Sequence, residues 1–387
     1  MDRKRILLGH LNSNGDCLLA TVVARQIKEV DYPNCHLTWA VNSKCKQSVF
    51  LNPYVDDIWE IPTEKALTNE DEWNAFVSEA ENKKKNGEFD FVFFTQIKGE
   101  NWFNYDGGIR SSTYNNYPHK ITVSHQPIIN LSGAEVENVS RFAEKHRLNK
   151  YKQVILVECG PNSFDVSLNA QAAYELASDI DFDSSEIAFI LSSNKQILSS
   201  RQNVIDASEL SFRENAELTK YCDLFIGCVS GISWLATTNW AKKLNMILVI
   251  AEEKHVLPSM IYDHEYLNLP VHHIIEIKDD QYSSEKVKNC LSKILTDGFA
   301  DARKSFSEKI KLSNYSYLNY QLAATSANLN FGKFFSCLSK SIKRNGIEII
   351  FTAQFRKIIW DLQFLARKKI LKMSGLKRSD IVIDKQK

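Results

Sequence analysis

The chain has 387 residues, of which 44% are apolar and 25% are charged, and its formal net charge at pH 7 is +1. This composition excludes an intrinsically disordered chain, and the length is sufficient for two domains with separate cores. No apolar run approaches the roughly 18 residues that a membrane-spanning helix needs, and the N-terminal residues lack the apolar stretch of a signal peptide. We therefore expect a cytoplasmic protein.

Apolar, strand-like runs alternate with helix-like stretches through about the first 300 residues, a pattern typical of parallel sheets with crossover helices. In the first half, strands are expected at 6–11, 36–41, 55–61, 89–94 and 121–125. After the charged stretch 144–152, a second series is expected at 153–159, 186–191, 222–227, 245–251 and 272–277.

Two successive series of similar length predict an α/β fold with two Rossmann-like parallel-sheet domains that face each other across a cleft. We expect the first domain at 1–150, the second at 151–300, and a helical segment with a basic tail at 301–387. Open parallel sheets bind ligands beyond the carboxyl ends of their strands, so the loops that leave the strands are the candidate sites.

The tail differs from the body in charge. From Phe331 onward the chain carries fourteen basic and four acidic residues, a net charge of +10, so the rest of the chain carries −9. Apolar residues at helical spacing are interleaved with Lys and Arg, which predicts an amphipathic helix that lies on an anionic membrane surface through residues 333–378. The alternative is an ordinary helix that packs on the body.

The first strand ends in a loop of small polar residues, Asn12, Ser13, Asn14 and Gly15, and the following helix begins with an acid, Asp16. Asp often caps a helix, which is the alternative role for this residue. The Glu or Gln that would complete a capping box three residues later is absent, because Leu19 stands there.

The stretch from residue 6 to residue 61 resembles the N-terminal signature of the family 9 glycosyltransferases, the ADP-heptose:lipopolysaccharide heptosyltransferases. The matching features are the Gly15-Asp16 loop, the Pro33-Asn34 turn, Trp39, and "NPYVD" at 52–56. The similarity continues more weakly to about residue 250. It implies a GT-B fold, with the acceptor on the first domain, the nucleotide-sugar on the second, and inversion at the anomeric carbon without a metal.

The resemblance gives Asp16 the role of catalytic base. A sugar hydroxyl is a poor nucleophile at pH 7, and a carboxylate within hydrogen-bond reach can take its proton as the new bond forms. The small neighbours Asn12, Ser13, Asn14 and Gly15 would leave room for the acceptor sugar. A helix N-terminus would favour the ionised form of Asp16.

The stretch 222–244 predicts a strand, a small-residue turn and a helix. The backbone N–H groups of the turn could receive the leaving diphosphate; these residues are Ser230, Gly231, Ile232 and Ser233. The alternative is that Gly231 only allows the helix to pack closely. The family pattern at this turn is Asp-Ser/Thr-Gly-x-x-His, and here Val229 and Trp234 replace its Asp and His.

Two further features bear on ligands. The first strand-exit loop of the second domain offers Asn162 and Ser163 to the donor, and it has no basic residue before Lys195, which is a further candidate to bind the donor phosphates. In the first domain, the loop 104–120 contains Arg110, which could meet an acidic or phosphorylated acceptor; the alternative is a plain flexible loop.

Cofactor and metal signals are missing from the sequence. The eight cysteines are scattered without a C-x-x-C pair, so we expect neither a zinc site nor disulfide bonds. The Gly-rich dinucleotide and P-loop fingerprints are also absent, and the basic residues of the body are mixed with acids, which argues against nucleic acid. We expect no metal and no cofactor.

The resemblance, together with the basic tail, therefore implies an inverting, metal-independent glycosyltransferase on the inner face of the cytoplasmic membrane. It would transfer a sugar from a nucleotide-sugar to a lipid-linked glycan in lipopolysaccharide, O-antigen or capsule biosynthesis. Two alternatives remain: a sugar-nucleotide epimerase or hydrolase of similar fold, and a catalytically inactive relative that serves as a binding or scaffold protein.

Overall fold

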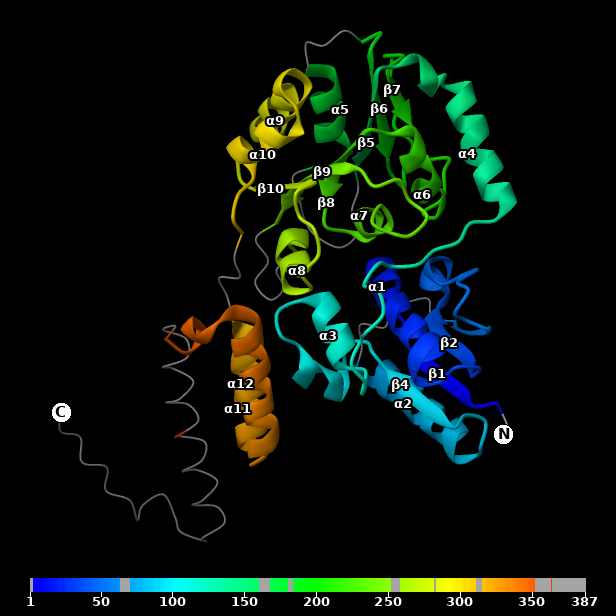
Figure 1. Cartoon of the computed structure of the whole chain (residues 1–387), viewed down its shortest axis with the longest axis vertical. Helices are drawn as coiled ribbons and strands as arrows, with labels where there is room; N and C mark the ends of the chain where they lie inside the picture. Colours follow the sequence, from blue (N-terminus) through cyan, green and yellow to red (C-terminus); the bar gives the residue numbers. More distant parts are fainter. Residues whose placement is uncertain are drawn as a thin grey trace, which may run out of the picture.

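The computed structural model describes residues 3–62, 70–159, 168–179, 184–251, 258–281, 283–310, 315–351 and 363. These residues form two α/β domains, one above the other in Figure 1, and a C-terminal pair of helices beside the lower domain. Each domain has one sheet with only parallel strands. The predicted fold class is therefore confirmed.

The N-terminal sheet has the strand order β3-β2-β1-β4. Its strands are β1 (Arg5–Gly9), β2 (His36–Asn42), β3 (Asp57–Ile61) and β4 (Phe91–Phe94). The helices of this domain are α1 (Asn14–Gln26), α2 (Glu70–Lys85) and α3 (Ile109–Asn115). The central strand β1 is apolar after its first residue, the exposed Arg5, and Leu7 and Leu8 are completely buried, as expected for a strand whose sheet is covered by helices on both faces.

The C-terminal sheet has the order β10-β9-β8-β5-β6-β7. Its strands are β5 (Gln153–Glu158), β6 (Ile187–Ser192), β7 (Val204–Asp206), β8 (Leu224–Cys228), β9 (Asn245–Ile250) and β10 (Ile274–Lys278). The surrounding helices are α4 (Gly133–Lys145), α5 (Ala170–Asp179), α6 (Glu214–Leu218), α7 (Gly231–Leu235), α8 (Met260–Tyr266), α9 (Ser283–Asp297) and α10 (Phe299–Phe306).

Each sheet has a point at which the strand order reverses. In the first sheet this point lies between β1 and β4, and in the second it lies between β5 and β8. Loops that leave two strands in opposite directions open a crevice at such a point, which is where open α/β sheets bind ligands. The loops after β1 and β8, which carry Asp16 and Ser230, are therefore placed at binding positions by topology.

Three predicted features differ from the structure. Residues 121–125 form no strand, because the N–H groups of Thr122 and Val123 donate to the side chain of Gln26 and not to a neighbouring strand. The short strand β7 was not predicted, since three residues give too little alternation to detect. The predicted loop 104–120 contains the helix α3.

Helix α4 lies on the C-terminal sheet, although its residues precede the predicted domain boundary at 150. Its buried side chains Val139 and Phe142 share an apolar cluster with Val154 and Leu156 of β5. Figure 1 shows α4 along the side of the upper domain. The chain therefore crosses between the domains before α4, at 121–132.

The two domains share a continuous core. Leu18 and Leu19 of α1 are fully buried in the same apolar cluster as Trp234 and Leu235 of α7. Full burial of a leucine side chain contributes about 1.5–3 kcal/mol to stability, and at this position part of that burial comes from contact between the domains.

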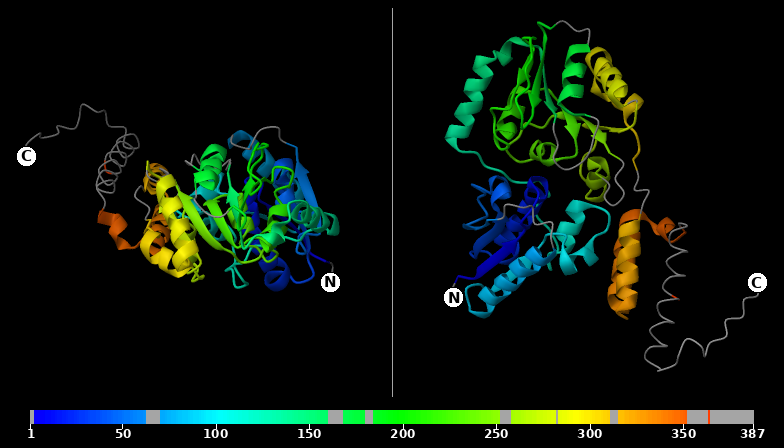
Figure 2. Two further views of the ribbon diagram at one scale, coloured as in Figure 1. Left: turned by 90° about the horizontal axis from the view of Figure 1, so that it is seen from above. Right: turned by 180° about the vertical axis from the view of Figure 1, so that it is seen from behind.

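The helices α11 (Ser316–Ala327) and α12 (Phe331–Asn345) return to the N-terminal domain, as both Figure 1 and Figure 2 show. The Tyr317 hydroxyl donates to the carbonyl oxygen of Asp106 at 2.9 Å, and the Gln321 amide donates to the carbonyl oxygens of Trp102 and Tyr105. The first part of the predicted tail is thus a helix packed on the body, and a short helical turn, Ile347–Phe351, follows it.

Residues 352–378 of the predicted membrane-binding region lie outside the described residues, apart from residue 363. Among the helices that the structure describes, none is both long enough and apolar enough to cross a membrane.

Candidate functional site

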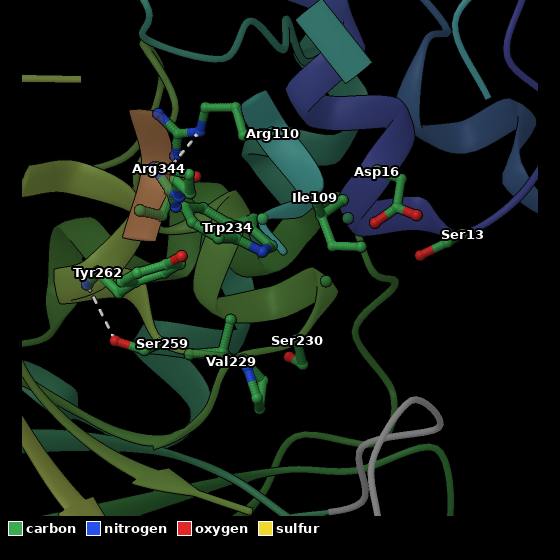
Figure 3. Close-up of a pocket in the computed structure, with 15 residues that line it drawn as sticks. Ser13, Asp16, Ile109, Arg110, Val229, Ser230, Trp234, Ser259, Tyr262 and Arg344 are labelled. Carbon is green, nitrogen blue, oxygen red and sulfur yellow. Dashed lines mark hydrogen bonds and ion pairs between the residues drawn. The ribbon is translucent and has the colours of Figure 1, made fainter. Parts of the chain in front are cut away.

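A cavity of about 150 Å³ lies between the two domains, at the points where the strand orders reverse. Its wall is assembled from five segments: the start of α1, the start of α3, the β8–α7 turn, α8, and the end of α12. Figure 3 shows side chains from all five segments around it. No single domain forms this cavity alone.

The loop after β1 holds the start of α1 in a strained conformation. Ser13 precedes the helix with φ of 67°, a left-handed value that costs a residue other than glycine about 1–3 kcal/mol. The segment that follows β4 holds the loop in place, because the Gln96 side-chain oxygen accepts hydrogen bonds from the N–H groups of Leu11 and Asn12. The result is that Ser13 and Asp16 both line the cavity.

Asp16 lies in the first turn of α1 and its side chain keeps only part of its surface open to the cavity. Burial raises the pKa of this carboxyl to about 7, and a hydrogen bond with Ser13 offsets part of that rise. The helix N-terminus was expected to keep Asp16 ionised, but desolvation outweighs it. A carboxyl with a pKa near the working pH is suited to act as a general base.

Two glycines bring the domains into contact beside Asp16. A Cβ atom added to Gly15 would lie 3.1 Å from Cδ1 of Trp234 and 3.4 Å from Cα of Gly231. A Cβ atom added to Gly231 would lie 3.1 Å from Cε2 of Phe212 and 3.5 Å from Cβ of Asn14. The starts of α1 and α7 therefore approach each other as closely as their backbones allow.

Side-chain hydroxyls of the β8–α7 turn accept hydrogen bonds from backbone N–H groups of the same turn. The Ser230 hydroxyl accepts from the N–H of Ile232 at 3.1 Å, and the Ser233 hydroxyl accepts from the N–H of Ser230 at 2.8 Å. The Ser230 hydroxyl in turn donates to Glu158, whose pKa burial raises to about 7. Phosphate binding by these backbone groups would need to replace bonds that the turn already makes.

An arginine from the N-terminal domain crosses the cavity wall. Arg110 of α3 is 1% exposed, and its Nε atom lies 3.0 Å from a carboxylate oxygen of Asp263 in α8. Its guanidinium carbon lies 4.6 Å from the centre of the Trp234 ring. Burial raises the pKa of Asp263, while the charge of Arg110 opposes that rise. This buried ion pair links the two domains.

The predicted site residues fall into three groups. Those that line the cavity are Ser13, Gly15, Asp16, Arg110, Ser230 and Gly231. Those that the structure describes away from the cavity wall are Asn12, Asn14, Lys195, Ile232 and Ser233. Of the second group, Asn14 accepts a hydrogen bond from Ser48 and Lys195 lies on the exposed loop after β6. Asn162 and Ser163 lie outside the described residues.

Several wall residues are not predicted from the sequence, among them Tyr262, Asp263 and Arg344. These three stand in α8 and α12, far along the chain from the first loop, in helices without a recognisable motif. The two residues that depart from the family pattern, Val229 and Trp234, also line the cavity.

Within the described ranges, no group of three or more His, Cys, Asp and Glu side chains is arranged to hold a metal ion. Metal independence stays a prediction.

Comparison with known proteins gives a match in structure but none in sequence. No protein-family model matches the chain, and no curated protein matches it. A solved structure of a family 9 glycosyl transferase from Veillonella parvula matches with a TM-score of 0.51 and 14% identity, over 77% of this chain and 91% of that one.

A second match is the E. coli ADP-heptose lipopolysaccharide heptosyltransferase II, with a TM-score of 0.50 and 12% identity, over 76% of this chain and 99% of that one. At such identities the likeness concerns the fold. The chain therefore shares the two-domain GT-B fold of the family 9 glycosyltransferases that its N-terminal sequence resembles.

Proposed function

We propose that this protein is an inverting glycosyltransferase that takes a sugar from a nucleotide-sugar donor. The observation that carries the proposal is Asp16, a carboxyl with a pKa of about 7 that opens into a cavity between two Rossmann-like domains. The shared GT-B fold supports it, as do the strand-order reversals on both sides of the cavity.

In the proposed reaction, an acceptor hydroxyl oxygen attacks the anomeric carbon of the donor sugar. Asp16 takes the hydroxyl proton while the bond between the anomeric carbon and the phosphate oxygen breaks, so a nucleoside diphosphate leaves and the configuration inverts. A base with a pKa near 7 is ionised in a large fraction of molecules at neutral pH and still holds a proton strongly enough to assist the attack.

No step of this reaction calls for a metal. Negative charge on the leaving diphosphate would be met by protein groups at the cavity wall. Asn162, Ser163 and Lys195 remain candidate donor-binding residues on the second domain, and Asn12 and Asn14 remain candidates on the acceptor side.

The acceptor that we propose is a lipid-linked or lipopolysaccharide-type glycan at the inner face of the cytoplasmic membrane. The basic sequence after Phe331 supports this choice, because a net charge of +10 favours an anionic surface. On α12, the large side chains of Phe331 and Phe335 are 59% and 63% exposed, which adds apolar area next to that charge.

The test is a transfer assay with a panel of nucleotide-sugars and a bacterial membrane fraction as acceptor, in the presence of EDTA. Wild type should release nucleoside diphosphate and label the glycolipid, and Asp16→Asn should lower the rate by about 100- to 10,000-fold. Release of free sugar without an acceptor would indicate a hydrolase or epimerase. Equal rates for wild type and Asp16→Asn would exclude Asp16 as the base.

A further inference from the structure

Arg344, near the end of α12, places a second guanidinium group at the cavity. The side chain is 8% exposed and lies between two tyrosines, with its guanidinium carbon 4.0 Å from the ring centre of Tyr262 and 4.1 Å from that of Tyr266. Stacking of this kind fixes the plane of the guanidinium and leaves its N–H groups at the edge free to bind.

None of the three Arg344 nitrogens has a hydrogen-bond partner among the described residues. The Nη2 atom of Arg110 is also buried without one. A buried, unpaired guanidinium is costly, so native structures provide it with a partner in nearly every case. Arg344 is without any such partner in the described part of the chain, and Arg110, although paired with Asp263 through Nε, keeps an unused donor at the same cavity. This arrangement indicates that the missing partner is a ligand.

The nearby carboxylates do not satisfy Arg344. Asp263 forms its ion pair with Arg110, and no described carboxylate lies within ion-pair distance of Arg344. The Asp106 carboxylate accepts hydrogen bonds from the Gly108 N–H and from the hydroxyls of Ser111 and Ser112. Burial raises the pKa of Asp106 and of Asp263, and both lie near enough for the charge of Arg344 to oppose that rise, but among the described residues no carboxylate is in direct contact with its guanidinium.

Hydrogen bonds of the neighbouring Asn345 and a close contact with Gly108 fix the position of Arg344. The side-chain amide of Asn345 donates to the carbonyl oxygen of Asp106 at 3.2 Å, and the Tyr262 hydroxyl donates to Asn345 at 2.5 Å. A Cβ atom on Gly108 would lie 2.7 Å from Nη2 of Arg344, so the guanidinium occupies space that only a glycine leaves. Figure 3 shows the guanidinium groups of Arg110 and Arg344 on the same side of Trp234, with Asp16 on the other.

We propose that Arg110 and Arg344 together bind a phosphate group of a substrate in this cavity. Guanidinium groups bind phosphate through paired, charge-assisted hydrogen bonds, and both groups have unused N–H donors here. The C-terminal helix α12 thereby becomes part of the substrate site. This inference rests on the proposed function only for the source of the phosphate, which is either the donor diphosphate or a phosphorylated acceptor.

The experiment is calorimetric titration of the full chain with pyrophosphate, with a panel of nucleoside diphosphates, and with glucose 6-phosphate as a sugar-phosphate probe. Arg344→Gln should weaken phosphate binding by about ten- to one-hundred-fold, because it removes charge-assisted hydrogen bonds. Arg344→Lys should recover only part of the loss, since lysine keeps the charge but not the planar fork. Arg141→Gln, on the exposed face of α4, is the matched control and should bind as wild type does.

The probes identify the source of the phosphate. Selective weakening of pyrophosphate and a nucleoside diphosphate assigns the donor, and selective weakening of glucose 6-phosphate assigns the acceptor. Melting temperatures without ligand, measured on each variant, separate a loss of packing from a loss of binding. If Arg344→Gln does not fold, Arg344→Lys gives the decisive comparison.

The inference is overturned if Arg344→Gln and Arg344→Lys bind every probe within twofold of wild type, or if wild type binds none of the probes. Different results would refute the phosphate-binding inference and the proposed glycosyltransferase function. Sugar transfer that depends on Asp16, together with unchanged phosphate binding in the Arg344 variants, refutes this inference alone. Phosphate binding that depends on Arg344, without any transfer from the nucleotide-sugar panel, refutes the proposed function alone.

Discussion

Asp16 shows how the surroundings of one side chain determine its chemistry. In water an aspartic acid is ionised above pH 4, but burial at the start of α1 raises the pKa of this one to about 7. The proton affinity that burial confers is what a base for a sugar hydroxyl needs.

The rate should therefore depend on pH through Asp16. Only the ionised carboxylate accepts the proton, so kcat/KM should rise with pH and level off above about 7. A pH series from about 3 to 9, with the acceptor concentration below its KM, measures this. Glu276→Gln serves as the control, because burial also raises the pKa of Glu276 to about 7, yet this residue does not line the cavity and the rise should persist. A midpoint near 4 would contradict the role of Asp16.

The close contact between the domains at Gly15 should be necessary for activity. A methyl group at this position would lie 3.1 Å from the Trp234 ring and should push the two domains apart beside Asp16. We expect Gly15→Ala to lower kcat/KM by about ten- to one-hundred-fold through misplaced substrates. Gly133→Ala is a matched control at a helix start, where an added Cβ meets nothing within 4 Å. Wild-type activity of Gly15→Ala would show that the close approach is not required.

Among the secondary-structure elements, the segment before α6 fastens the C-terminal domain to the N-terminal one. The Arg213 guanidinium donates to the carbonyl oxygens of Gln47 and Phe50 at 2.9 and 2.8 Å, and to a carboxylate oxygen of Glu135 at 2.5 Å. It is 4% exposed, so these bonds lie in a desolvated interface. One side chain thus joins three segments that are distant in sequence.

Loss of this side chain should destabilise the whole molecule. Arg213→Ala leaves the Glu135 carboxylate without its counter-charge and the carbonyl oxygens of Gln47, Phe50 and Asn130 without this donor. It should lower the free energy of unfolding by about 3–5 kcal/mol. Urea denaturation at pH 7 measures the change, and Arg141→Ala on the exposed face of α4 should change it by less than about 0.5 kcal/mol. A loss below 1 kcal/mol for Arg213→Ala, which is within the range of exposed pairs, would show that the interface does not depend on this residue.

The sequence was sufficient to predict those elements whose signal is local. The apolar run that becomes β1, the small loop after it and the acid at the start of α1 stand within one short stretch, and their order alone places Asp16 at the carboxyl edge of a sheet. Residues 121–125 were mistaken for a strand because their alternation is real: Ile121 and Val123 do pack on the sheet. Their N–H groups, however, bond to a side chain.

The contribution of α12 was beyond prediction from one sequence. Arg344 meets Tyr262, Tyr266 and Gly108 only because the chain returns to the N-terminal domain after the second sheet is complete. Nothing in the local pattern around Arg344 distinguishes it from the other basic residues of the C-terminal region. Its role depends on tertiary contacts, which periodicity and spacing do not encode.

In the molecule as a whole, acidic and basic residues are distributed unevenly along the chain. The acidic body contains both sheets, and the basic C-terminal region begins at α12, which is docked on the N-terminal domain. Cys337 and Leu338 face the Trp102 to Tyr105 region, whereas Phe335 stays exposed. The region therefore has one part that belongs to the site and a following part whose charge suits a membrane.

A truncation can separate these parts. A chain that ends at Phe351 keeps α12 and its contacts, so its melting temperature should equal that of the full chain, while its binding to anionic liposomes should fall strongly with the lost positive charge. A chain that ends at Asn330 should also lose thermal stability, because it lacks α12 and Arg344. Flotation of liposomes with and without anionic lipid measures the binding. Undiminished flotation of the chain that ends at Phe351 would exclude the membrane role of the residues beyond it.

The central claim is that the cavity between the domains receives a nucleotide-sugar, and nucleotide binding tests it most directly. A ligand that binds the native state raises the melting temperature according to its concentration relative to its dissociation constant. We predict that one nucleoside diphosphate of a complete panel, measured in EDTA, raises the melting temperatures of wild type and Asp16→Asn equally, because Asp16 acts on the acceptor. If no member of the panel changes either melting temperature, the cavity is not a donor site, and a catalytically inactive scaffold becomes the better account.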